Sequence, residues 1–347
     1  YIYILIIFIG IPATFLYNIL SGIIRSMGDS RTPLMFLVIS SLLNIGLDLL
    51  CIVVFKMGVA GAAAATVVSQ LISGLLCLRY MIRKYEILHI TKDEWRADPD
   101  QMKLLCSMGV PMGLQYSITA VGSVIMQTAV NSLGSVAVAS VTASGKVSMF
   151  FACPFDALGS TMATYGGQNV GAKRLDRLGK GLFSCSVLGV GYSLCAFVVM
   201  YFFGTNFAQL FVSTKEIEIL NNARQMLIIN SAFYVPLAFV NIIRFMIQGM
   251  GYSTFAILAG VFEMVARTLA GLVLVPRLGF LGACFSNPMA WVAADLFLIP
   301  AYIHVRRKLN RQFGQEASAT FFNPLTYLFS CHRLKYRLPL LPRRKAE

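Results

Sequence analysis

Apolar runs of about 20 residues recur along most of this chain, and they limit its possible folds more than any other feature. A helix of that length crosses the hydrocarbon core of a bilayer. Charged residues are only 13% of the total, about half of what a soluble domain carries. The sequence therefore predicts an all-α, polytopic membrane bundle with about nine transmembrane helices. The nine apolar segments are 2–24, 33–55, 58–82, 103–131, 136–162, 181–204, 225–250, 254–276 and 280–304.

Lysine and arginine are distributed unevenly over the turns between these segments. They gather in the turns 25–32, 79–103 and 172–180 and in the C-terminal tail, whereas the alternate turns carry few or none. Because basic residues are enriched on the cytoplasmic side, we expect a protein of the cell membrane with a cytoplasmic C-terminus. The same distribution accounts for the net charge of +14, so the expected partner is the lipid bilayer and not nucleic acid.

One short stretch recurs near the other end of the chain. NILSGIIRSMGDS (18–30) and NIIRFMIQGMGYS (241–253) are identical at six of thirteen positions, at an offset of 223. GVAGAA (58–63) and GFLGAC (279–284) correspond at an offset of 221. An offset of about six segments preserves the direction across the membrane, and such parallel repeats are typical of transporters, with the substrate between the halves. We expect two pseudo-symmetric lobes from a parent of about twelve helices, without its first three here.

The repeat also predicts a division of the chain. Residues 1–84 are expected to form the last three helices of an N-lobe and 85–102 a cytoplasmic linker between the lobes. Residues 103–310 are expected to form a six-helix C-lobe, and 311–347 a basic C-terminal tail.

Local signals predict where some helices begin and end. Gly28 is expected to end one helix in the left-handed conformation, and Thr32 with Pro33 to begin the next. The paired glycines 166–167 are expected to end the helix of segment 136–162, with the amides of residues 168–169 forming a structural elbow.

The residue types needed for a metal site or for catalysis are not arranged for either role. The eight cysteines form no CxxC and fall mostly inside apolar segments, and the three histidines have no metal-ligand spacing. A membrane enzyme would need a clustered catalytic set, such as a histidine with an aspartate, and the sequence shows none. We expect no metal site and no enzymatic activity.

Four stretches resemble the multidrug and toxic compound extrusion family. They are RSMGDSRTP (25–33), GVPMGLQ (109–115), GGQNVGAKRLDR (166–177) and GACFSNPMAWVAADLFLIPAY (282–302). The resemblance covers about residues 2–309 and corresponds to family helices four to twelve.

That resemblance implies a function. The family is one of cation-coupled antiporters (H+ or Na+) that export small organic, cationic or amphipathic compounds by alternating access between two lobes. It implies no cofactor beyond the coupling ion, and a monomer when full length. A flippase or exporter of lipid-linked oligosaccharides or polysaccharides, from the same superfamily, stays open as the alternative.

Carboxylates at membrane depth are the candidates for coupling to an ion. Glu263 is followed at i+4 by Arg267 on the same helix face, so it is either an ion site influenced by Arg267 or one half of a structural ion pair. Asp48 and Asp156 are either ion sites or buried structural acids, and for Asp295 we favour the structural role.

Polar stripes on the apolar segments are the candidates for a substrate cavity. Spacings of three and four residues place such side chains on one helix face. Each stripe either lines the cavity or serves hydrogen bonding and close packing between helices. For Lys146 the alternatives are snorkelling or a polar cavity, and we favour the cavity. The candidates are Gln115, Thr119, Lys146, Asn241, Arg244 and Arg267.

Overall fold

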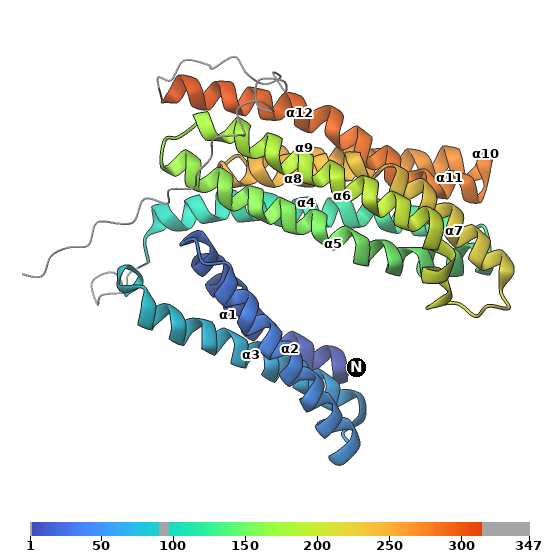
Figure 1. Ribbon diagram of the computed structural model, residues 1–347, viewed down its shortest axis with the longest axis horizontal. Helices are drawn as coiled ribbons and strands as arrows, with labels where there is room; N and C mark the ends of the chain where they lie inside the picture. Colours follow the sequence, from blue (N-terminus) through green and yellow to red (C-terminus); the bar gives the residue numbers. More distant parts are fainter. Residues whose placement is uncertain (1, 90–96, 314–347) are drawn as a thin grey trace, which may run out of the picture. The chain divides into compact units, whose positions relative to one another are not determined.

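The computed structural model describes residues 2–89 and 97–313, where the chain folds into helices joined by short turns (Figure 1). It separates into two compact units, one up to Gly113 and one from Leu114 onward. The long helices are α1 (Ile2–Ser26), α2 (Arg31–Leu49), α3 (Gly58–Lys84), α4 (Pro99–Asn131), α5 (Ser135–Gly171), α6 (Asp176–Gln209), α7 (Ile217–Ala232), α8 (Tyr234–Gly249), α9 (Thr254–Leu269) and α12 (Ser286–Gln312). Shorter pieces are α10 (Val275–Leu278), α11 (Phe280–Cys284), the 3-10 turn Glu86–Leu88 and two π-helical stretches, Leu50–Val54 and Ala270–Leu274.

The surface of this fold is that of a membrane protein. Within the described residues, eight helices are long and apolar enough to span a bilayer, and α7 with α8 makes a possible ninth. Large apolar side chains face outward, for example Phe150 and Ile9, while charged side chains such as Glu263 are buried. This is the arrangement expected when lipid surrounds the helices. The prediction of a polytopic helical bundle is confirmed.

In the first unit, α3 packs along both α1 and α2. The contacts combine a small buried cluster with hydrogen bonds and close approaches between helices. The Ser40 hydroxyl of α2 donates to the Ser69 carbonyl of α3, at 2.8 Å. A Cβ on Gly74 of α3 would lie 3.3 Å from the backbone nitrogen of Tyr17 in α1. Small residues at such contacts are how helices associate in lipid.

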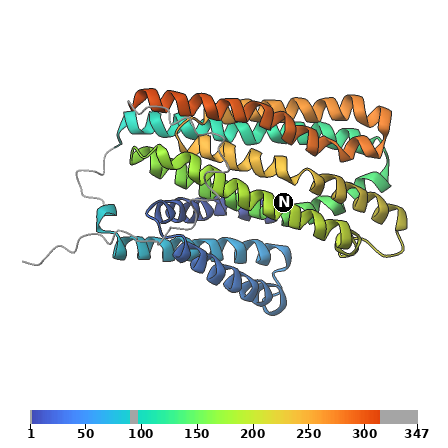
Figure 2. The same ribbon diagram turned by 45° about the horizontal axis from the view of Figure 1, so that its top comes forward.

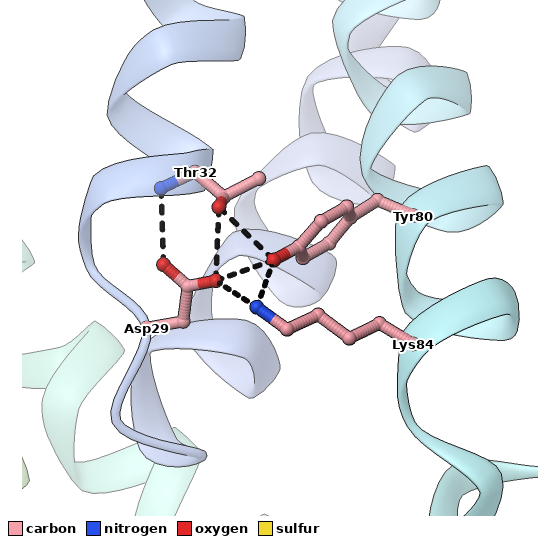
Figure 3. A network of polar contacts seen from close by, with 4 residues as sticks. All are labelled: Asp29, Thr32, Tyr80 and Lys84. Atoms are coloured by element: carbon pink, nitrogen blue, oxygen red, sulfur yellow. Dashed lines mark hydrogen bonds and ion pairs between the residues drawn. The ribbon is translucent and has the colours of Figure 1, made fainter.

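A polar network ties the α1–α2 turn to the end of α3 (Figure 3). The carboxylate of Asp29 accepts hydrogen bonds from the Thr32 backbone N–H (3.1 Å) and hydroxyl (2.9 Å) and from the Tyr80 hydroxyl (2.6 Å). The Lys84 ammonium lies 3.1 Å from the same carboxylate. Helix α2 begins at Arg31, so Thr32 lies inside the first turn, and Asp29 satisfies its N–H. The helix therefore begins one residue before Thr32, the residue predicted to begin it.

This network predicts a pH-dependent contribution to stability. The Tyr80 hydroxyl first, and then the Thr32 donors and the Lys84 ammonium, hold the pKa of Asp29 well below its usual range. Its contribution is therefore complete above the unfolded pKa of about 3.9 and is lost as the pH falls through the lower folded value. Asp29→Asn should cost about 1 kcal/mol at neutral pH, and this difference from the wild type should shrink below about pH 4. Thermal melts at neutral and acidic pH measure it; an equal difference at both would contradict the role of the charge.

The sequence repeat has a matching repeat of geometry. Gly28 after α1 and Gly251 after α8 both have φ of +91°. In each turn the residue after the glycine donates its N–H to the carbonyl five positions earlier. The Asp29 N–H donates to the Ile24 carbonyl at 3.3 Å, and the Tyr252 N–H to the Ile247 carbonyl at 3.1 Å. The left-handed conformation that favours glycine therefore ends the helix in both copies, as predicted for Gly28.

A second matching pair follows further along each copy. Gly58 and Gly279 have φ of +56° and +59°. Each follows one of the two π-helical stretches within a few residues; Gly58 is the first residue of α3, and Gly279 directly precedes α11. The two parts of the chain thus share local backbone geometry where they share sequence.

Two predicted boundaries in the second unit were wrong. The first concerns the paired glycines, since α5 continues through them to Gly171. A Cβ on Gly166 would lie 3.2 Å from the carbonyl oxygen of Met246, and one on Gly167 3.1 Å from that of Gly249. These glycines allow α5 to approach α8 closely, and the elbow predicted at residues 166–169 is absent.

The second concerns segment 225–250, which is two helices, α7 and α8, bent by 52°. Pro236 lies in the first turn of α8. A proline has no N–H to donate, and its ring clashes with the carbonyl four residues earlier, here that of Ala232. The chain breaks at Phe233, where a continuous helix would have met this clash.

Helix α8 is the centre of the second unit. It packs against α5, α6 and α12, while α12 also packs along α9, so that the long helices run side by side (Figures 1 and 2). The core includes an aromatic group in which Phe155 of α5 lies 5.5 Å from Tyr234 and 5.1 Å from Tyr192, between ring centroids. Because α8 is enclosed, any polar side chain on it needs a partner from a neighbouring helix.

Candidate functional site

Three charged side chains meet inside the second unit. Arg244 comes from α8, and Glu263 and Arg267 come from α9. The Arg267 Nη1 lies 3.3 Å from Glu263 Oε2, and Arg244 Nη2 contacts Glu263 Oε1. All three residues are buried. Glu263 thus bridges two guanidinium groups, and we refer to the three residues as the arginine–glutamate cluster.

Helical spacing explains one half of the cluster. Glu263 and Arg267 are four residues apart on α9, which is the pairing that the sequence indicated. Arg244 joins from α8 across the α8–α9 turn, and the sequence analysis did not pair it with Glu263. The available signal was that short turn, which brings side chains of both helices within reach of one another.

The polar stripe of α4 lies next to the cluster. Gln248 of α8 donates its side-chain N–H to the Gln115 side-chain oxygen, at 2.9 Å. A Cβ on Gly260 of α9 would lie 3.2 Å from Gln115 Cγ and 3.5 Å from the Thr119 hydroxyl oxygen. In this conformation Gln115 and Thr119 therefore contact neighbouring helices. This agrees with their interpretation as packing residues between helices, the alternative to a cavity lining.

The other two candidates for the cavity lie in different surroundings. Asn241 is buried on α8, where its side-chain N–H donates to the Leu237 carbonyl of the previous turn, at 3.2 Å. Lys146 is exposed on α5, with its ammonium 5.4 Å from the centroid of the Phe211 ring. Within the described part of the chain, neither side chain forms a hydrogen bond or ion pair with the cluster.

The remaining acids differ in their relation to the cluster. Asp156 lies on α5 and Asp295 on α12, two of the helices that pack against α8. Asp295 is buried, whereas Asp156 is exposed. Asp48 on α2 belongs to the first unit and is half-buried, and among the described residues its Oδ1 has no hydrogen-bond partner.

A cavity of about 170 Å³ lies against Arg267. Its polar lining residues other than Arg267 were not predicted from the sequence. Ser123 and Gln127 extend the stripe of Gln115 and Thr119 at intervals of four, so the signal for them was present. Nothing in the sequence pointed to the others. The full lining is Ser123, Met126, Gln127, Val130, Val141, Met226, Arg267, Ala283, Ser286 and Asn287.

Across residues 2–89 and 97–313, no three His, Cys, Asp or Glu side chains gather as metal ligands would. Part of the predicted linker 85–102 and most of the predicted tail 311–347 lie outside the described residues.

Comparisons with known proteins bear on the identity of the chain. Its sequence matches the MatE family over residues 1–50 and 111–273. Probable multidrug resistance protein YpnP of Bacillus subtilis (strain 168) is 31% identical over 217 residues, which cover 62% of this chain and 48% of the relative. Probable multidrug resistance protein YoeA of the same organism is 28% identical over 323 residues, covering 87% of this chain and 67% of the relative. The chain thus spans about half the length of YpnP.

Solved structures show the same fold. The crystal structure of MATE in the bent conformation has a TM-score of 0.81 at 20% identity, covering 90% of this chain and 70% of that one. MATE in complex with MaL6 has a TM-score of 0.83 at 20% identity, covering 89% and 70%. The match to the family model extends over more than half of this chain's residues. The chain also shares the fold of solved MATE structures. The chain therefore belongs to the MatE family of membrane transporters, the multidrug and toxic compound extrusion family.

Proposed function

We propose that the chain is part of a cation-coupled antiporter that exports small organic compounds, cationic or amphipathic, out of the cell. The observation that carries this is the match to relatives named as multidrug resistance proteins, which for YoeA extends over 87% of this chain. Members of this family are secondary transporters and not enzymes. The flippase or polysaccharide exporter alternative is not favoured by these names.

The wider transport scheme is also part of the proposal. The parallel repeat supports alternating access between two lobes. In this scheme residues 1–84 belong to the N-lobe, 85–102 form the linker and 103–310 form the C-lobe. The basic turns support a place in the cell membrane with a cytoplasmic C-terminus. We further propose a monomer when full length, with no cofactor beyond H+ or Na+.

Three carboxylates are candidates for the coupling ion. Glu263 contacts two arginines, so its charge is already matched in this conformation. In the described part of the chain, Asp48 and Asp156 take part in no ion pair. A coupling group must exchange its cation within each cycle, which supports Asp48 and Asp156 as the exchanging sites and a structural role for Glu263.

The test is efflux from cells. The protein containing this chain, expressed in a host without its own major efflux pumps, should lower the accumulation of ethidium, a lipophilic cation. A protonophore or replacement of external Na+ should restore accumulation and so identify the ion. Asp48→Asn or Asp156→Asn should reduce efflux toward the empty-vector level, with normal amounts of protein in the membrane.

A matched control is Asp176→Asn. Asp176 is an exposed acid at the start of α6, paired with Arg174, and its loss should leave efflux unchanged. Unchanged efflux in both Asp48→Asn and Asp156→Asn would remove them from the coupling role. Ethidium accumulation that does not respond to expression of the protein would contradict the export of organic cations.

A further inference from the structure

The cavity beside Arg267 has a single ionisable side chain in its wall, and it is a cation. Arg267 is buried, and its guanidinium has five N–H donors. The hydrogen bond to Glu263 at 3.3 Å uses one of them. The wall therefore presents a guanidinium that retains capacity for a further acceptor.

The charges around Arg267 leave this cation incompletely matched. The cluster holds two arginines and one carboxylate, because Arg244 and Arg267 share Glu263. Among the described residues, neither Asp156 nor Asp295 lines the cavity or forms an ion pair with Arg267. A buried charge is stable when it is paired. An anionic group in the cavity would complete the pairing on the Arg267 side.

A buried hydroxyl gives an independent indication of a ligand. Ser286, at the start of α12, is 3% exposed and lines the cavity. Among the described residues its hydroxyl has no hydrogen-bond partner, which is uncommon for a buried polar group. Gln127, Ser123 and Asn287 add polar atoms to the same wall. The Ser286 hydroxyl and the amide groups of Gln127 and Asn287 can donate into the space in front of Arg267, whereas the Ser123 hydroxyl already donates to the Thr119 carbonyl, at 3.2 Å.

The size of the cavity suits one functional group. Its volume of about 170 Å³ is below the range of roughly 300–1,000 Å³ typical of sites for drug-sized molecules. The cavity therefore fits part of a ligand. A guanidinium matches the planar geometry of a carboxylate with two parallel hydrogen bonds, whereas an ammonium group would be repelled.

We propose that this cavity binds the carboxylate group of an organic anion or zwitterion. Arg267 supplies the opposite charge, and the Ser286 hydroxyl donates a hydrogen bond. The inference rests on the proposed transport function and adds to it a site for substrates that carry a carboxylate. The phosphate of an anionic lipid offers the same charge, so the experiment separates these two sources.

The first measurement uses the full chain in nanodiscs of phosphatidylcholine. Benzoate, benzyl alcohol and benzylamine share one ring and differ in charge, and calorimetric titration gives their affinities. Benzoate should bind about tenfold or more tightly than the other two. Equal binding of the three, or preference for benzylamine, would overturn the proposal. A second titration adds phosphatidylglycerol to the nanodiscs: unchanged benzoate affinity supports a small-molecule carboxylate, and competition by the lipid would overturn that assignment.

Variants locate the site. Arg267→Gln should reduce benzoate affinity about tenfold or more, and Ser286→Ala about threefold or more. Arg277→Gln makes the same change at an exposed arginine of α10 that does not line the cavity, and should have no effect. If Arg267→Gln does not fold, the proposal is decided by the benzoate affinity of Ser286→Ala and by the wild-type preference for benzoate over benzylamine. Unchanged affinity in every folded variant of the cavity would overturn the proposal.

These results are separable from the proposed function. A benzoate preference without ethidium efflux would contradict cation export and support the carboxylate site. Ethidium efflux without a benzoate preference would leave the export proposal standing and overturn this inference alone.

Discussion

Replacing Glu263 with glutamine should lower the free energy of unfolding by about 3–5 kcal/mol. The change removes the carboxylate that bridges two guanidinium groups, so that Arg244 and Arg267 face each other without an anion between them. Each arginine is only 8% exposed, so hydration compensates little of the lost charge pairing. Thermal and denaturant unfolding of the purified protein in detergent measures the effect.

A surface ion pair provides the control. Asp176→Asn breaks the 3.1 Å pair with Arg174, in which both side chains are more than half exposed, and should cost at most about 1 kcal/mol. A double variant that also carries Arg267→Gln should be less destabilised than Glu263→Gln alone, because it leaves one uncompensated arginine instead of two. Wild-type stability in Glu263→Gln would contradict the cluster as described.

Replacing Gly249 with alanine should cost about 3 kcal/mol or more, or prevent folding. An added Cβ would lie 2.1 Å from the carbonyl oxygen of Ala163 and 2.7 Å from its Cα. These are backbone atoms of α5, so no change of rotamer relieves the contact. Helices α5 and α8 would have to separate, and α8 is the centre of the second unit. The melting temperature of the purified variant reports the loss.

The matched substitution is Gly191→Ala in α6. Its added Cβ meets no atom within 4 Å, and the residue is exposed. Alanine has the higher helix propensity, so this variant should be as stable as the wild type or gain up to about 1 kcal/mol. The two alanine variants should therefore change stability in opposite directions, and a common direction would argue against the close approach of α5 and α8.

The spans and the family could be predicted because apolar length and short motifs are local properties. The bend at Phe233 was missed because hydropathy continues across Pro236 and carries no information about direction. The paired glycines 166–167 were misinterpreted because glycine serves both helix ends and close contacts. Only the carbonyl oxygens of α8, about 3 Å from their added Cβ positions, distinguish these uses.

The candidate site was predictable to the extent that it lies on one helix. Spacing on α9 indicated Glu263 and Arg267, whereas the contact of Arg244 depends on how α8 and α9 fold back on each other. The cavity requires α4, α9 and the start of α12 to converge, so its serine at 286 carried no signal in the sequence.

The Asp29 network has a counterpart of different chemistry in the second copy of the repeat. Tyr252 occupies the position that corresponds to Asp29, and Lys308 of α12 lies over its ring, 5.1 Å from the centroid. Dissolved ions weaken an exposed ion pair such as Asp29 with Lys84, and attraction of an ammonium to a ring depends less on paired charges. We therefore expect high salt to weaken the Asp29–Lys84 ion pair more than the contact of Lys308 with the Tyr252 ring.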